Sequence, residues 1–246
     1  MSDKMSDKMP ADAPLLLARD LTKTFGRFTA LRSLSLAVPE GEFLTIVGRN
    51  GAGKTTFLKI VSSIVRSYTG DVLLGGRNLK DADEDTRRKI GFVSHESLLY
   101  KDLTVRDNLS YYARMYGVPD RDRKIDEMIR RVGLDAKSSV LVSALSRGMK
   151  QRLSLARAFI HEPSVLLLDE PFTGLDERAS GILEEVLAEF KRSRGTVIMV
   201  THDIDRGWTH ADRVVVFERG TVAKEISARE TSLGAFKDEY RRILGN

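Results

Sequence analysis

The amino-acid sequence predicts an α/β protein whose sheet is mainly parallel and covered by helices. Short apolar runs, typical of buried strands, alternate with segments whose apolar residues recur at helical spacing. The strand candidates in this pattern are 43–47, 165–168, 197–200 and 214–217, and a helix candidate at 182–190 lies among them. Alternation of this kind is typical of a doubly wound sheet.

The N-terminal part of the chain has a different character. Residues 1–14 are polar and contain Met-Ser-Asp-Lys twice, so we expect a disordered tail. Residues 15–17 and 34–38 are apolar runs on either side of a turn at Gly26. Such runs on either side of a glycine turn predict antiparallel strands. We therefore expect an antiparallel β subdomain at the start of a single domain that covers 15–246.

Two further strand candidates, 71–74 and 90–93, precede a stretch with helical character from about 96 to 161. Its apolar residues recur at helical spacing, at Leu109, Tyr112, Ala113 and Tyr116 and again at Ile125, Met128, Ile129 and Val132. Glycine and proline stand mainly between these segments. The pattern predicts an α-helical subdomain inserted into the domain.

Composition indicates a soluble globular domain. Hydrophobic residues make up 41% of the chain and charged residues 30%, which excludes disorder as its main state. The longest apolar runs, such as 165–168, are far shorter than the ~20 apolar residues that a bilayer-spanning helix needs. The start of the chain lacks the apolar core of a signal peptide. The absence of cysteine excludes disulfides and thiolate metal sites. We expect a cytoplasmic protein.

The charge balance is mildly basic. The chain carries 40 basic and 35 acidic residues, a formal net charge of +5. The two signs are interspersed, and the run 121–124 alternates between them, as solvated helix faces do. Aromatic residues are not interleaved with arginines in a stacking pattern, so we expect no nucleic-acid partner. Attraction to an anionic membrane surface accounts for this basicity equally well.

The segment 48–56 fits the phosphate-binding pattern G-x-x-x-x-G-K-S/T between a strand candidate and a helix candidate. Its residues are Gly48, Arg49, Asn50, Gly51, Ala52, Gly53, Lys54, Thr55 and Thr56. Glycines let successive backbone N–H groups face one point, at which the following helix also aims its positive end. Lys54 would neutralise the outer phosphates, and the Thr55 hydroxyl would bind Mg²⁺. The sequence therefore predicts a nucleoside triphosphate site.

Two carboxylates, Asp169 and Glu170, follow the apolar run 165–168 directly. This order places both at the carboxyl end of a buried strand, where ligands of α/β proteins bind. Asp169 suits coordination of Mg²⁺, and Glu170 could orient or deprotonate an attacking water. The alternative is a strand that simply ends in solvent with two acidic residues.

The segment 145–152 predicts a second anion site. Ser146 and Gly148 stand just ahead of a stretch with helical periodicity, as an N-cap and its loop would. Exposed N–H groups and a serine hydroxyl at a helix start bind anions. A plain capped helix is the alternative for this segment taken alone.

Together these motifs resemble the ATP-binding-cassette (ABC) ATPases, the nucleotide-binding subunits of ABC transporters, over about 15–222. The segment 145–151 is similar to the family's signature, and Gly174-Leu175-Asp176 looks like its D-loop. The resemblance implies a mainly parallel P-loop NTPase core with ATP and Mg²⁺ as cofactors. It implies that Phe25 stacks on adenine, that Asp176 contributes to the nucleotide site, and that His202 is a catalytic switch histidine.

The resemblance also implies an assembly. Family members form head-to-tail dimers, so the partner would be a second copy or another ABC ATPase. Ser146 and Gly148 of one subunit would complete the γ-phosphate site built by Lys54, Asp169 and Glu170 of the other. The permease would be a separate polytopic membrane protein, and the chain would lie peripherally on the cytoplasmic face of the inner membrane.

His95 departs from the family pattern, which has glutamine at this position with its amide near Mg²⁺. Imidazole is a poorer ligand for a hard cation than an amide oxygen. Two interpretations stay open, namely that His95 lies near the metal or that it is an exposed loop residue without a metal role.

Residues 92–105 and 111–117 look most like the heme-exporter ATPases of cytochrome c maturation, which implies export of heme. The alternative is the ATPase of an ABC-2 type exporter of drugs or polysaccharides. A soluble cassette protein without a transport role, and a P-loop enzyme that modifies a small molecule, are further hypotheses from other classes.

Overall fold

The computed structural model describes residues 13–94 and 97–245. Its larger sheet is mainly parallel, as predicted, with β9 and β10 as its antiparallel edge pair. In spatial order the strands are β10 (Thr221–Ser227), β9 (Arg213–Glu218), β3 (Phe43–Gly48), β8 (Thr196–Val200), β7 (Val165–Asp169) and β6 (Ile90–Val93). Strands β3, β7 and β8 are buried along their whole length, which explains their continuous apolar runs.

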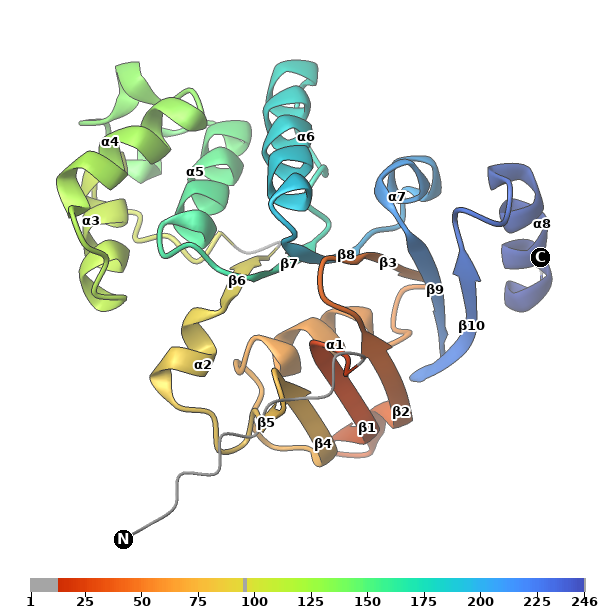
Figure 1. Cartoon of the computed structure of the whole chain (residues 1–246). Coiled ribbons are helices and arrows are strands. Elements are labelled where there is room, and N and C mark those ends of the chain that lie inside the picture. Colours follow the sequence, from red (N-terminus) through yellow and green to blue (C-terminus); the bar gives the residue numbers. More distant parts are fainter. Residues whose placement is uncertain (1–12, 95–96, 246) are drawn as a thin grey trace, which may run out of the picture.

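The expected antiparallel N-terminal subdomain is present as a second sheet. In spatial order its strands are β2 (Phe28–Val38), β1 (Leu16–Phe25), β4 (Thr69–Leu74) and β5 (Arg77–Asn78). Helix α1 (Lys54–Val61) lies between this sheet and the larger one (Figure 1). Its Phe57 and Leu58 are fully buried in a core that both sheets share. The start of α1 is therefore held between two rigid layers.

The helical insert contains α3 (Val105–Met115), α4 (Arg121–Arg131) and α5 (Arg147–Phe159), with 3-10 turns at Asp135–Lys137 and Val142–Ala144. Thr104 caps α3 by accepting a hydrogen bond from the Asp107 N–H at 3.1 Å. The insert shares a core with α6 (Glu177–Arg192) on one face of the larger sheet (Figure 1).

Several elements were not identified from the sequence, namely β5, β10, α2 (Glu84–Arg88), α7 (Ile204–His210) and α8 (Leu233–Leu244). Helix α8 covers the β9–β10 edge through Phe236, which stacks on Trp208 with a centroid distance of 4.9 Å. Over the described part of the chain, none of the helices combines the length and apolar character needed to cross a bilayer. The expected tail mostly precedes residue 13 and so lies outside the described residues.

Candidate functional site

A cavity of about 500 Å³ opens at the carboxyl ends of β3 and β7, around the start of α1. Its lining joins the two sheets and the loop that begins the helical insert. The residues that line it are Phe28, Ala30, Asn50, Gly51, Ala52, Gly53, Lys54, Thr55, Thr56, Lys59, Ile64, Phe92, Ser94, Leu98, Asp169, Glu170 and Val200. Two motifs that are more than 100 residues apart in the sequence thus meet in one cavity.

The phosphate-binding loop connects β3 to α1 and requires glycine at two close approaches. Gly48 has φ +148°, and a Cβ there would collide with the Phe217 carbonyl oxygen of β9. Gly53 has φ +100°, and a Cβ there would lie 2.5 Å from the Ala30 carbonyl oxygen of β2. Larger residues would push the loop away from both sheets.

Lys54 is the first residue of α1, and its side chain turns back over the loop. The Nζ atom donates hydrogen bonds to the carbonyl oxygens of Gly48 at 2.7 Å and Arg49 at 3.0 Å. Burial lowers the pKa of Lys54, while the carboxylates of Glu170 and Asp169 oppose that shift. The ammonium group is thus held inside the cavity, where anionic oxygens could replace the loop carbonyls as its partners.

Thr55 and Asp169 form a second polar contact in the cavity. The Thr55 hydroxyl donates to Asp169 Oδ1 at 3.1 Å, and Asp169 ends the buried strand β7. Both groups offer oxygen atoms, which Mg²⁺ prefers. The described residues contain no cluster of three or more His, Cys, Asp or Glu side chains able to hold a metal. The set fits a cation that takes few protein ligands and completes its shell with phosphate oxygens and water.

Glu170 is held by contacts to the end of β8. Its φ is +53°, and its N–H donates to the Val200 carbonyl oxygen at 2.9 Å. The carboxylate accepts a hydrogen bond from the Thr201 hydroxyl at 3.3 Å, and His202 Nδ1 lies 2.8 Å from its Oε2. The His202 imidazole is largely exposed. An unusual backbone conformation fixed by three contacts is typical of functional positions.

Sequence reasoning missed Thr201, Phe28 and Ile64. Thr201 directly precedes His202, which the family resemblance implies to be the switch histidine, so its position next to His202 was a signal that could have identified it. Phe28 and Ile64 are apolar residues next to turns, and no local pattern distinguishes such residues from ordinary surface positions.

Other candidate residues lie away from the cavity lining. Ser146 is the N-cap of α5, and its hydroxyl accepts from the Met149 N–H at 3.2 Å. Asp176 caps α6 by accepting from the Ala179 N–H at 2.8 Å. Gly148 faces open space, and Phe25 is not among the lining residues. His95 lies outside the described residues.

The fold and this cavity define an α/β nucleotide-binding protein with a phosphate loop. The family model described as ABC transporter matches residues 31–173, which is more than half of the chain. The chain belongs to the ABC transporter family of ATP-binding cassettes.

Two curated relatives are similar over most of the chain. The methionine import ATP-binding protein MetN of Brucella abortus (strain 2308) is 35% identical over 227 residues, or 89% of this chain and 62% of MetN. The spermidine/putrescine import ATP-binding protein PotA of Haemophilus influenzae (strain 86-028NP) is 32% identical, over 91% of this chain and 61% of PotA. The chain thus spans about three fifths of the length of these relatives.

A solved structure shares the fold. It is the dimeric post-hydrolysis state of the ATP-binding cassette MJ0796 bound to ADP and Pi, with a TM-score of 0.79 and 28% identity. The match covers 87% of this chain and 99% of that one. Because the two relatives above are named as import proteins, the comparisons do not support the expected export of heme.

Proposed function

We propose that this chain binds ATP with Mg²⁺, hydrolyses it and drives a separate membrane permease. The observation that carries the proposal is the meeting of the phosphate loop with Asp169 and Glu170 in one cavity. Lys54 would neutralise the outer phosphates, and Thr55 and Asp169 would hold Mg²⁺. Glu170 would orient or deprotonate the attacking water. His202 would hold the Glu170 carboxylate in position through their 2.8 Å contact.

Replacement of Glu170 by glutamine tests the hydrolytic role. Glu170→Gln keeps the size and the hydrogen-bond acceptor of the side chain but cannot take a proton. Phosphate release should fall about hundredfold or more, while ATP binding measured by calorimetry persists. The control is Glu185→Gln, an exposed acid on α6 that should leave both quantities unchanged. Hydrolysis by Glu170→Gln at the parent rate would contradict this role.

Lys54→Ala tests the binding role of the loop separately. Because the ammonium is the buried cation beside the outer phosphates, its loss should weaken ATP binding at least about tenfold. The readout is the ATP dissociation constant rather than turnover. An unchanged constant would contradict the placement of the phosphates.

An exposed apolar surface supports a protein partner. We define the aromatic patch as Leu98, Tyr100, Tyr111 and Met115, whose exposed fractions lie between 41% and 47%. The Tyr100 and Tyr111 rings pack edge to face, with centroids 4.8 Å apart. Clustered exposed aromatic residues are typical of interfaces. Tyr100, Tyr111 and Met115 do not line the nucleotide cavity, whereas Leu98 does, so the patch begins at the cavity and extends along α3. This place suits docking of the permease.

A second nucleotide-binding subunit is the other proposed partner, as a second copy of this chain or another ABC ATPase. Ser146 and Gly148 support it because the helix start that they form, with Ser146 exposed and Gly148 partly exposed, does not line the chain's own cavity. The resemblance assigns this helix start to the nucleotide of the opposite subunit. The chain would then work as a dimer on the cytoplasmic face of the membrane.

The cargo and the direction of transport stay predictions. Export of heme rests on the resemblance of 92–105 and 111–117 alone, and the relatives named as methionine and polyamine importers do not favour it. Reconstitution of the chain with its permease in vesicles tests this. If heme added on the side of the membrane that carries the ATPase stimulates ATP hydrolysis, the result would support export of heme. If heme stimulates hydrolysis only when it is added on the opposite side, the result would contradict export of heme.

A further inference from the structure

A buried aromatic side chain, Phe172, lies just beyond the carboxylate that is proposed to act on water. It stands two residues after Glu170, in the loop that leads from β7 to α6. The Thr173 N–H donates to the Glu170 carbonyl oxygen at 3.2 Å, which closes a turn around Phe172. The Phe172 side chain is 8% exposed and does not line the nucleotide cavity. A displacement of its ring would therefore reach Glu170 through a short, hydrogen-bonded stretch of backbone.

Helix α7 packs on the Phe172 ring with two residues that are one helical turn apart. The Arg206 guanidinium carbon lies 5.1 Å from the ring centroid. The His210 ring stacks on Phe172 with centroids 5.9 Å apart and planes 5° apart. His210 also stacks on Phe43 of β3, with centroids 5.7 Å apart. Guanidinium–aromatic and offset stacked pairs attract each other, so α7 holds the Phe172 ring in place.

Helix α7 is itself fixed on the larger sheet. A Cβ at Gly207 would lie 2.9 Å from Thr45 Cγ2 and 3.0 Å from Thr201 Cγ2, so a larger residue would push the helix away. The Thr45 hydroxyl donates to the Gly207 carbonyl oxygen at 2.9 Å. The Arg206 side chain also donates to the Ser180 hydroxyl of α6 at 3.4 Å. Figure 1 shows α6 and α7 on the same face of the larger sheet. Helix α7 is thus a firm support for Phe172.

The segment that leads into α7 reaches the same carboxylate from the other side of the helix start. His202 stands two residues before α7, and its Nδ1 lies 2.8 Å from Glu170 Oε2. The Thr201 hydroxyl donates to the same oxygen at 3.3 Å and accepts from the Asp203 N–H at 3.0 Å. Two chains of contacts therefore join Glu170 to α7, one through Phe172 and one through His202.

We propose that Phe172 is a positioning residue that sets the 2.8 Å contact between His202 and Glu170 by anchoring the loop after β7 to α7. The inference rests on the proposed hydrolysis of ATP. Because Phe172 lies outside the cavity lining, its loss should disturb the orientation of the Glu170 carboxylate and not the binding of ATP. A displacement of about 1 Å in a reacting group can cost about hundredfold in rate, so a small movement of this loop is sufficient.

Phe172→Leu in the full chain tests this role against an ordinary role in the core. Phosphate release at saturating ATP should fall at least about fivefold, while the ATP dissociation constant measured by calorimetry stays within about twofold. Phe172→Tyr keeps the ring and its stacking, so it should retain most of the parent rate. The matched control is Phe190→Leu, at a phenylalanine that is also 8% exposed and packs edge to face on Phe159. It should lose a similar amount of stability but keep hydrolysis within about twofold.

A combination of variants tests whether Phe172 acts through His202. In the His202→Ala background, Phe172→Leu should lower the remaining rate less than about twofold, because residues that act as a unit give non-additive losses. Arg206→Ala weakens the same support from a partly exposed position and serves if Phe172→Leu does not fold. Its hydrolysis should fall at least about threefold at unchanged ATP affinity. Its control is Arg192→Ala, at an exposed arginine on α6.

Three outcomes would overturn the assignment. They are hydrolysis at the parent rate in Phe172→Leu, an equal loss of hydrolysis in Phe190→Leu, and a full additional loss when Phe172→Leu is combined with His202→Ala. If Phe172→Leu does not fold, hydrolysis at the parent rate in Arg206→Ala would overturn it instead. If the parent chain releases no phosphate from ATP, the proposed function itself fails and this inference with it.

Discussion

At the scale of single residues, His161 is a buried imidazole with a clear effect on stability. Its ring stacks on Tyr116 with centroids 4.0 Å apart, and its Nε2–H donates to the Ile90 carbonyl oxygen at 3.1 Å. Burial lowers the pKa of His161 to about 4; the bond to Ile90 opposes that shift, and Arg157 and Arg88 add to it. The folded protein therefore keeps this histidine neutral at neutral pH.

A lowered pKa in the folded state makes stability depend on pH in a defined direction. Below the ordinary histidine pKa of about 6.5, the unfolded chain binds the proton more readily than the folded chain. The free energy of unfolding should thus decrease as pH falls from about 6.5 to 4, by about 2 kcal/mol between pH 7 and pH 5. His161→Phe keeps an aromatic stack and cannot titrate, so it should remove this part of the decrease. Urea unfolding at pH 7 and pH 5 measures the free energy of unfolding of the parent and the variant. An equal pH dependence in the two proteins would exclude His161 as the cause of the decrease in stability.

The residues predictable from the sequence are those tied to one local pattern. Lys54, Thr55 and Asp169 line one cavity, and each could be singled out from the sequence because a strand–loop–helix motif and a strand end are local patterns. Thr201 reaches the site through the pairing of β8 with β7, and Phe28 through the packing of β2 against the phosphate loop, and both join segments that are distant in the sequence. No spacing rule within one segment encodes such contacts.

At the scale of elements, the strength of the local sequence pattern separates the strands that could be predicted from those that could not. Strands β3, β7 and β8 are buried on both faces and therefore have continuous apolar runs. Strand β10 is an edge strand with mostly exposed residues, and the helix that covers the neighbouring edge, α8, buries mainly Phe236. Elements with so few buried residues leave a weak periodic signal.

The aromatic patch on helix α3 and the segment before it is predicted to bind the membrane partner. In the folded chain the Tyr111 ring contacts the rings of Tyr100 and Tyr112. Tyr111→Arg therefore places a positive charge beside these two rings. Because none of the three tyrosine rings lines the nucleotide cavity, ATP hydrolysis by the isolated chain should stay within about twofold of the parent value. Docking on a membrane partner should weaken at least about tenfold, since burying an unpaired charge at an interface costs several kcal/mol.

Sedimentation with membranes from the source organism measures this effect as the bound fraction of the chain. The control is Ala223→Arg, which introduces the same charge at an exposed position on β10. Equal membrane binding by Tyr111→Arg and the parent would show that the patch does not contact the permease.

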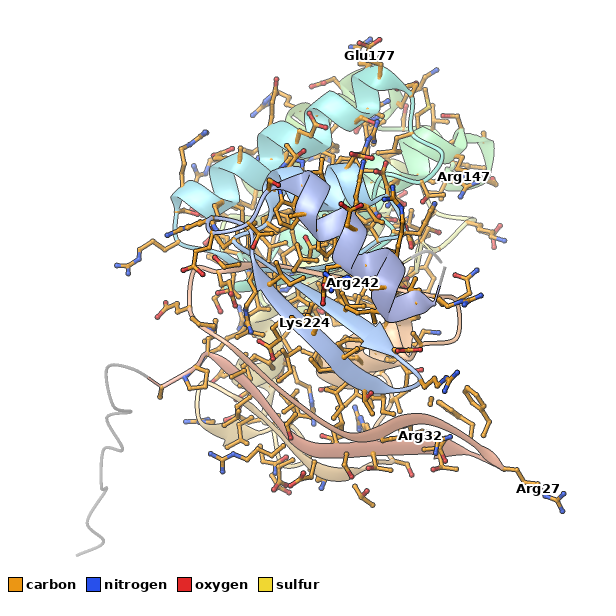
Figure 2. The ribbon with its side chains drawn as sticks, turned by 90° about the vertical axis from the view of Figure 1, so that its right-hand side faces the viewer. Arg27, Arg32, Arg147, Glu177, Lys224 and Arg242 are labelled. Carbon is orange, nitrogen blue, oxygen red and sulfur yellow. The ribbon has the colours of Figure 1, made fainter. Side chains whose placement is uncertain are left out.

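At the scale of the whole molecule, the start of α5 is joined to the loop that follows β7. The Arg147 side chain packs on Gly174, where a Cβ would lie 2.8 Å from its Nε. Gln151 donates to the Pro171 carbonyl oxygen at 3.2 Å. The segment that includes Ser146 is therefore held against the loop beyond Glu170, although Ser146 does not line the cavity of its own chain. Figure 2 shows Arg147 at the surface, so a second subunit can reach this region.

This arrangement predicts that Ser146 matters for dimer formation and not for nucleotide binding by one chain. Ser146→Asp keeps a side chain that caps helices well but adds a negative charge facing the proposed γ-phosphate of the partner. Ser146→Arg adds bulk at the same place. Both variants should bind ATP as tightly as the parent. In the Glu170→Gln background, where ATP persists, both should lose the ATP-dependent dimer seen by analytical ultracentrifugation. Ser139→Asp, at an exposed serine in the turn that follows Asp135–Lys137, should dimerise normally. A Ser146→Asp dimer of parent affinity would rule out the proposed head-to-tail geometry.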